Sequence, residues 1–273
     1  MKQAFVPILA LALSAVLPTA HAEHRLFPTD ILEKGEADLW FLYSQYSYSQ
    51  SFVWDVYPGR QKLERTNEYI EARYGLGSDW QVGAGLSYNS SYRLHTDYDL
   101  GQHYLNTRNG GRGNPYFWAD YGLFNSKDGR FTLKGQFVTS LRTADDRVTA
   151  YTSRLTAGWE AGSGLKLWSQ YGETQSLGGH TTGLVKIGAH QIFGDHLTFT
   201  AAAHYNVSAG QSSNTNVRSN GVGLGALVEV AHNTYINPSI TIDRIGTETS
   251  RRSPTRWIAT DTKYIEIAAY HLF

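Results

Sequence analysis

Residues 222–230 read Val-Gly-Leu-Gly-Ala-Leu-Val-Glu-Val, and this stretch decides the fold class. Apolar side chains occupy every second position from Val222 to Val230, while glycines and Glu229 fill most positions between them. Successive side chains of a β-strand point to opposite faces, so the alternation predicts a strand with one apolar face and one small or polar face. The same period-two pattern recurs throughout residues 36–273.

The recurring stretches predict about twelve antiparallel strands, within a range of ten to fourteen. We expect them near residues 36–52, 62–75, 80–91, 114–123, 130–142, 149–160, 165–172, 181–193, 197–207, 219–230, 235–243 and 261–273. Short turns rich in Gly, Asn and Asp alternate with long polar connections at 92–113, 208–218 and 244–260. This asymmetry is typical of outer-membrane barrels, so we predict an all-β, transmembrane antiparallel β-barrel over residues 36–273.

The two faces of the predicted strands indicate that lipid covers the apolar one. The opposite face carries Gly, Ser, Thr and Gln with single charges, which suits a wet or ion-paired lumen better than the apolar interior of a soluble barrel. Aromatic rings are favoured at a lipid–water boundary and gather near predicted strand ends, at Tyr74, Trp80, Tyr88, Tyr121, Tyr151, Trp159 and Tyr171. A soluble sandwich or barrel is the alternative. Pro238 fits poorly in a closed sheet, because it lacks an N–H.

The composition excludes several other classes of protein. The 273 residues contain no cysteine, which excludes disulfide scaffolds, thiolate metal sites and cysteine nucleophiles. Basic and acidic residues balance at 24 each, so no nucleic-acid partner is expected. After the N-terminus no stretch reaches the roughly 18 apolar residues of a membrane-spanning helix.

Both termini carry export signals. Lys2 and an apolar run from Ala4 to Val16, followed by Ala20-His21-Ala22, are typical of a secretory signal peptide over residues 1–22. Residues 23–35 are then expected to form a short periplasmic lead. The terminal Phe273 resembles the C-terminal signal that bacterial outer-membrane proteins present to their barrel-assembly machinery. We therefore expect a bacterial outer-membrane location, in contact with membrane lipids and lipopolysaccharide.

Three segments carry a family resemblance: Leu26-Phe27-Pro28-Thr29-Asp30 with the following Glu33-Lys34-Gly35-Glu36-Ala37-Asp38, the hairpin at 74–83, and Gly111-Arg112-Gly113-Asn114-Pro115. They resemble an outer-membrane family labelled after the meta-pathway of phenol degradation. A more distant similarity to hydrophobic-compound transporters of the fatty-acid type implies lateral or luminal passage of apolar substrates. Those transporters have a longer N-terminal plug, so the sequence does not predict a hatch.

The pattern places a set of charged and aromatic side chains on the lumen face. The candidate lumen-lining residues are Arg73, Lys134, Arg154, Lys186, His190, His204, Glu229 and Trp168. Acidic and basic positions on this face are equal in number, so we expect no strong ion selectivity. Two arrangements stay open: rings of charge around a water-filled constriction, or charges that pair across a narrow bore and fill it.

No motif on the chain indicates catalysis. His190 and His204 fall on the lumen face and would need Glu229 or Asp243 as a third metal ligand, so we interpret them as hydrogen-bonded lumen residues instead. Ser153 and Ser169 fall on the apolar face without a histidine beside them. We therefore expect no catalytic residue, no metal and no cofactor, and a channel for small solutes, with hydrophobic or aromatic compounds suggested by the resemblance alone. The alternatives are a lipid-modifying hydrolase and a structural or adhesion barrel without an open pore.

Overall fold

The structure is a computed structural model, and it describes residues 27–99, 101–141, 150–176, 180–194, 196–210, 216–249 and 255–273. The predicted signal peptide, residues 1–22, lies outside the described residues. Within the described part, no helix is long and apolar enough to cross a membrane.

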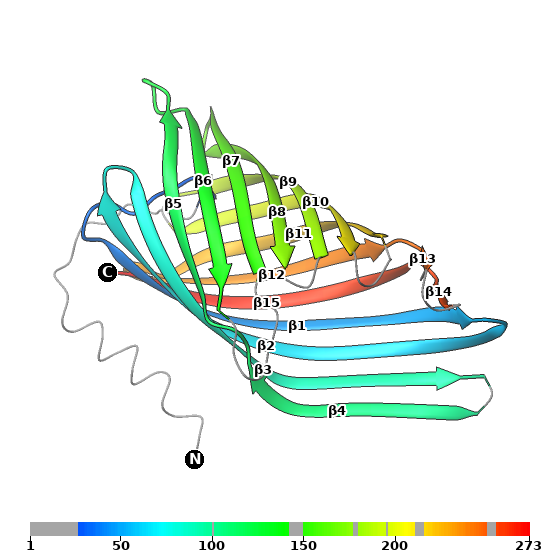
Figure 1. Cartoon of the computed structure of the whole chain (residues 1–273). Coiled ribbons are helices and arrows are strands. Elements are labelled where there is room, and N and C mark those ends of the chain that lie inside the picture. Colours follow the sequence, from blue (N-terminus) through cyan, green and yellow to red (C-terminus); the bar gives the residue numbers. More distant parts are fainter. Residues whose placement is uncertain are drawn as a thin grey trace, which may run out of the picture.

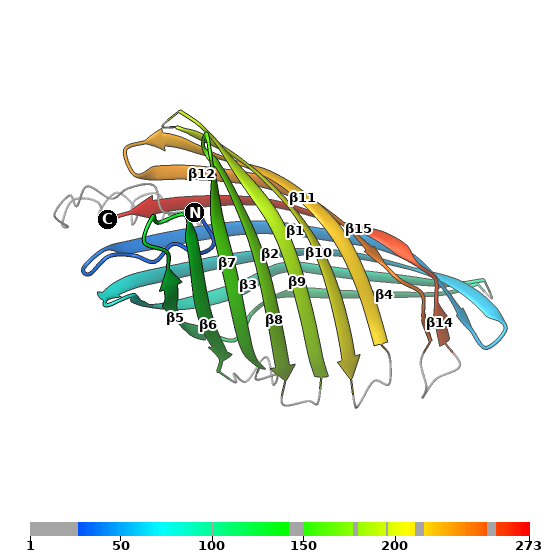
Figure 2. The same cartoon turned by 90° about the horizontal axis from the view of Figure 1, so that it is seen from above.

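Twelve strands form a closed antiparallel barrel, as the period-two pattern predicts. They are β1 (Ala37–Trp54), β2 (Tyr57–Gly77), β3 (Trp80–Tyr98), β5 (Tyr116–Asn125), β6 (Phe131–Ser140), β7 (Ala150–Gly162), β8 (Leu165–Ser176), β9 (His180–Phe193), β10 (Leu197–Gly210), β11 (Asn216–Ala231), β12 (Thr234–Ile245) and β15 (Thr260–Leu272). Each pairs with its neighbours in chain order, and β1 closes the barrel by pairing with both β2 and β15. Figure 2 shows β6 to β10 side by side in chain order.

The turns divide the barrel into two ends. Tight connections near residues 78–79, 126–130, 163–164 and 232–233 lie at one end, which we call the short-turn end and which is periplasmic in such barrels. Ser163 and Asn233 adopt positive φ in these turns, as tight hairpin connections require. The terminal Phe273 donates its N–H to Ala37 O at 2.8 Å, so the C-terminus lies beside the start of β1.

The opposite, outer end differs from the predicted loops. The segment 92–113, predicted as a long connection, is mostly β-structure: β3 continues to Tyr98 and pairs with β4 (Gln102–Arg112). Figure 1 shows β1 to β4 projecting beyond the ends of the other barrel strands. Part of 244–260 forms the short strands β13 (Glu248–Thr249) and β14 (Thr255–Trp257), and β14 pairs with β1. Within 208–218, residues 211–215 lie outside the described part.

The outer surface of the barrel is an apolar band. Leu224, Ile187 and Leu86 are each more than half exposed on the face that would meet lipid. The seven aromatic residues predicted at strand ends are all exposed, at 37 to 55%. Trp80 and Tyr88 lie eight positions apart on β3, about 26 Å of strand. Allowing for strand tilt, this spans most of the apolar band of about 25 Å that a bacterial outer membrane requires.

The residues before β1 lie inside the barrel at the short-turn end. The predicted periplasmic lead is described from Phe27 onward. Leu32 is 3% exposed and packs in a cluster with side chains that come from three different strands: Leu227, Tyr235, Tyr270 and Leu272. Its N–H donates to Gln81 Oε1 at 2.8 Å. The residues before β1 therefore fill part of the barrel interior at the short-turn end, which the sequence did not predict.

Pro238 lies at an interruption in the sheet. The β11–β12 ladder pairs Gly225 with Ser239 and resumes only at Val228 with Ile236. On its other side Pro238 pairs with Ile267 of β15. A proline cannot donate to a ladder, so the missing N–H falls where the two strands are not bridged.

Candidate functional site

The lumen wall near the short-turn end is held by ion pairs. Arg73 of β2 donates through Nε to Asp38 Oδ2 at 2.8 Å, and its guanidinium lies 5.5 Å from the centre of the Trp40 ring. Lys134 of β6 places Nζ 3.9 Å from Asp120 Oδ2. Both predicted lumen cations therefore point inward, where a charge away from bulk water requires a partner.

The same end is crossed by the N-terminal segment. Thr132 of β6 donates its hydroxyl to Thr29 Oγ1 at 2.6 Å, and Lys134 Nζ donates to Asp30 O at 3.5 Å. Phe27 packs edge-on against the ring of His190, with centroids 5.3 Å apart. Because these partners come from strands at different positions around the barrel, residues 27–32 narrow the bore at the short-turn end.

The middle of the lumen carries a second polar set. Arg154 donates through Nη1 to Gln136 Oε1 at 2.7 Å. Lys186 of β9 pairs in register with His204 of β10, so both side chains point to the same inner face. His204 Nε2 lies 3.0 Å from Asp243 Oδ1, and both side chains are 11% exposed.

Trp168 lies flat against the inner wall. It faces Gly188 directly across the β8–β9 ladder, and a Cβ on that glycine would lie 2.5 Å from two carbon atoms of the indole. His190 continues the same face, with its ring centroid 6.3 Å from that of Trp168. Trp168 and His190 therefore form an aromatic surface inside the barrel, and Phe27 packs against its His190 ring.

Glu229 lies at the rim rather than in the middle of the lumen. Its Oε2 is 2.8 Å from Nδ1 of His196, and its Oε1 accepts the N–H of Asn233 at 3.0 Å. Both partners belong to tight turns at the short-turn end. The side chain thus ties two turns together.

The two lumen histidines do not share a site. His190 pairs with Thr200 across the β9–β10 ladder, whereas His204 lies four positions further along β10, about 13 Å away. Asp243 accompanies His204 alone, and Glu229 is at the rim. The conjectured His190–His204 metal site is therefore absent from the described residues. The expectation that the protein is not an enzyme stays a prediction.

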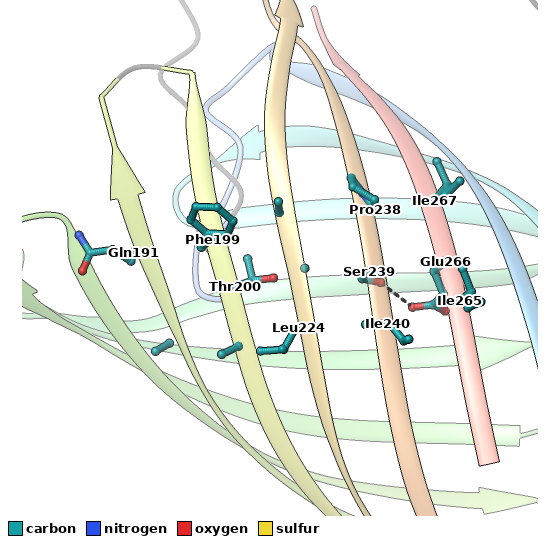
Figure 3. A pocket seen from close by; sticks show the side chains of 14 residues that line it. Gln191, Phe199, Thr200, Leu224, Pro238, Ser239, Ile240, Ile265, Glu266 and Ile267 are labelled. Atoms are coloured by element: carbon teal, nitrogen blue, oxygen red, sulfur yellow. Dashed lines mark hydrogen bonds between the residues drawn. The ribbon is translucent and has the colours of Figure 1, made fainter. Parts of the chain in front are cut away.

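A hollow opens on the lipid-facing side of the wall at β9 to β12 and β15 (Figure 3). Its volume is about 650 Å³. Outward-facing apolar side chains such as Phe199, Leu224 and Ile240 surround it, and small residues such as Ala226 form its floor. Ser239 and Glu266, which point into the lumen and share a hydrogen bond of 3.4 Å, also line it. The hollow therefore lies on the outer side of the sheet beside Pro238, at the interruption of the β11–β12 ladder.

A lumen cavity of about 270 Å³ lies behind this hollow. It is lined by Trp40, Leu42, Tyr69, Glu71, Asn237, Ser239, Glu266 and Ala268. Ser239 and Glu266 belong to both linings, so the hollow and the lumen cavity lie on opposite sides of the same part of the sheet. Sequence reasoning missed this place, although Pro238 and the glycines of β11 mark it as a weak point of the sheet.

An aromatic pocket of about 470 Å³ lies at the outer end. Phe52, Trp54, Tyr98, Tyr104 and Trp257 line it together with Gln61, Thr96 and Thr255. Five of these residues continue the lumen face of β1, β2 and β3, while Tyr104 comes from β4 and Thr255 and Trp257 come from β14. Stacked rings with a few hydrogen-bonding groups suit a flat or apolar solute.

A cluster of potential metal ligands lies on the opposite face of the same hairpin. His95 Nε2 and His103 Nδ1 lie 2.9 Å and 2.6 Å from Asp97 Oδ1. The hydrogen bond from His103 holds the pKa of Asp97 below its usual range. Sequence reasoning missed this cluster because it placed residues 92–113 in a loop; only pairing of β3 with β4 brings His103 opposite Asp97.

Comparison with known proteins relates this architecture to outer-membrane barrels. No protein-family model matches the chain, and no curated protein matches its sequence. An outer membrane channel from Pseudomonas putida F1 has a TM-score of 0.65 at 10% identity, covering 92% of this chain and all (100%) of that one. The translocator domain of the autotransporter NalP from Neisseria meningitidis has a TM-score of 0.51 at 14% identity, covering 89% and 90%.

At such identities the shared property is the fold. Together with the apolar exterior and the closed twelve-stranded sheet, it makes this chain an outer-membrane β-barrel of bacteria. The resemblance to the meta-pathway family stays a prediction, since no family model matches.

Proposed function

We propose that the protein is an outer-membrane channel for small solutes, and that it favours hydrophobic or aromatic ones. The observation that carries this proposal is that a hollow on the lipid side and a cavity in the lumen share Ser239 and Glu266 in their linings. The hollow of about 650 Å³ is concave and mostly apolar, as small-molecule sites usually are.

Two further features support apolar solutes. The outer-end pocket offers five aromatic side chains where a solute would first meet the protein. The N-terminal segment narrows the bore at the short-turn end, which disfavours a wide aqueous path straight through the barrel. A solute that enters from outside would pass along the lumen cavity and leave beside Pro238 toward the membrane.

The test is the entry of a hydrophobic fluorescent probe, 1-N-phenylnaphthylamine, into cells whose lipopolysaccharide layer excludes it. Expression of the protein is expected to speed its entry. Ala226→Phe places a bulky side chain in the hollow from the lipid side, where apolar residues are tolerated, and is expected to slow entry severalfold. Ala157→Phe on β7, also outward-facing but far from the hollow, is the matched control and is expected to leave entry unchanged.

Planar-bilayer recordings of refolded protein separate this route from an aqueous pore. Both variants are expected to keep the ion conductance of the wild type, because neither side chain enters the lumen. Equal probe entry with Ala226→Phe and Ala157→Phe would place the solute path elsewhere. If the wild type shows no conductance and no probe entry, the channel proposal is contradicted. That result would favour the structural or adhesion barrel.

A further inference from the structure

We propose that His95, Asp97 and His103 bind one divalent d-block metal ion, with Zn²⁺ as the reference ion, on the outer end of the protein. Among the residues that the structure describes, this is the only group of three potential ligands whose donor atoms all lie within 4.8 Å of one another. Two imidazoles and one carboxylate suit zinc, copper, nickel and iron rather than magnesium or calcium.

The register of the hairpin brings the three donors together. His95 and Asp97 are two positions apart on β3, so their side chains share a face. Asp97 pairs directly with His103 of β4. The site thus bridges two strands, and each ligand sits on regular β-structure rather than on a loose loop.

The distances leave little to rearrange. In a tetrahedral zinc site with bonds of about 2.0–2.1 Å, neighbouring ligand atoms lie about 3.3 Å apart. Here the two imidazole nitrogens lie 2.9 Å and 2.6 Å from one carboxylate oxygen. To bind a metal ion, each imidazole nitrogen would move away from the carboxylate oxygen by less than 1 Å. The ion would keep at least one coordination position for water.

Nearby cations on the same face are already engaged. Arg60 and Lys62 of β2 lie opposite Asp97 and His95 in register. Arg60 Nε donates to Ser49 Oγ at 2.8 Å, and Lys62 Nζ pairs with Glu64 at 2.7 Å. Their charges are therefore partly directed away from the proposed site.

The site also has a structural consequence. Tyr98 and Tyr104 are next in sequence to Asp97 and His103, and they point to the other face of the hairpin, with ring centroids 5.8 Å apart. Both line the outer aromatic pocket. A metal ion that links β3 to β4 would therefore hold these two rings in position.

The experiment uses untagged, full-length mature protein refolded in detergent, stripped with a chelator and titrated with Zn²⁺ by calorimetry. The wild type is expected to bind one Zn²⁺ per chain. His103→Ala and Asp97→Asn each remove one ligand and are expected to weaken binding by at least about tenfold. His196→Ala is the matched control, because its imidazole pairs with a single carboxylate, Glu229, at the other end of the barrel; its affinity is expected to equal that of the wild type.

Hydrogen exchange supplies a second measurement. Zn²⁺ is expected to slow exchange of the β3–β4 hairpin amides in the wild type and in His196→Ala, but not in His103→Ala. Heat-modifiable migration on gels shows that each variant folds. Tighter binding of Cu²⁺ through the same residues also supports the site, because affinities generally rise toward copper. No zinc uptake by the wild type, or equal uptake by His103→Ala, would overturn the proposal.

Discussion

Individual glycines make room for the lumen side chains. His204 reaches Asp243 across Gly221, which lies between them in the β10–β11–β12 ladders. A Cβ on Gly221 would lie 1.8 Å from Asp243 Oδ1 and 2.8 Å from the imidazole. Gly188 similarly leaves space for Trp168. The glycines of the polar face therefore determine which large side chains can lie flat against the wall.

Gly221→Ala is expected to separate His204 from Asp243 and to lower the free energy of unfolding by about 1–3 kcal/mol, the cost of leaving a buried polar group without its partner. Urea unfolding of the refolded barrel in lipid measures the change. Gly183→Ala is the control, because a Cβ at Gly183 meets no atom within 4 Å. Equal stability of the two variants would show that the His204–Asp243 pair contributes nothing to the free energy of unfolding.

The strands combine one lipid-facing side with one lumen-facing side. On β11, Val222 and Leu224 face outward and are 59% and 63% exposed, whereas Leu227 faces the interior and is 2% exposed. Residues on the outer side need only be apolar, since lipid adapts to them. Residues on the inner side must find specific partners.

Leu224→Arg is expected to impair assembly, because a basic residue at the middle of the bilayer costs about 2–4 kcal/mol. Lys186→Ala is expected to fold almost normally and to change conductance instead, because its side chain faces the lumen. Heat-modifiable migration after refolding into vesicles measures both. Normal assembly of Leu224→Arg together with aggregation of Lys186→Ala would invert the assignment of the two faces.

The whole molecule is a barrel that is partly closed by its own N-terminal segment. Phe27 and Thr29 contact the inner wall, and a Cβ on Gly158 would lie 2.5 Å and 2.7 Å from them. Leu32 anchors the segment among the buried residues of β11, β12 and β15. The wall hollow near Pro238 lies on the outer side of the same barrel, opposite a lumen cavity that shares Ser239 and Glu266 with it.

Deletion of residues 27–31, with Leu32 retained as the anchor, is expected to raise the single-channel conductance severalfold, because the bore at the short-turn end loses its contents. Planar-bilayer recording measures it. Phe27→Ala, which keeps the chain length, is expected to give a smaller increase. Unchanged conductance after the deletion would show that another constriction limits the current.

The order of the elements could be predicted from the sequence because it follows from local periodicity. All twelve predicted barrel strands are confirmed, but β2 begins five residues earlier and β3 ends seven residues later than predicted, both at the outer end. The seven aromatic residues at strand ends lie on the exterior as expected. Alternation along one strand assigns the faces without reference to any other strand. The structure places the side chains of Arg73, Lys134, Arg154 and Lys186 on the inner face.

Only the tertiary structure decided what those inward side chains meet. Strand register separates His190 from His204 and brings Asp97 close to His103. Contacts between distant segments place Phe27 inside the barrel. The energy of a side-chain pair depends on which residues lie opposite each other in neighbouring strands. The sequence of one strand does not determine how it is aligned with the next. The chain by itself therefore determined a membrane barrel, whereas closure in three dimensions determined its partly filled bore, its wall hollow and its outer cluster of His95, Asp97 and His103.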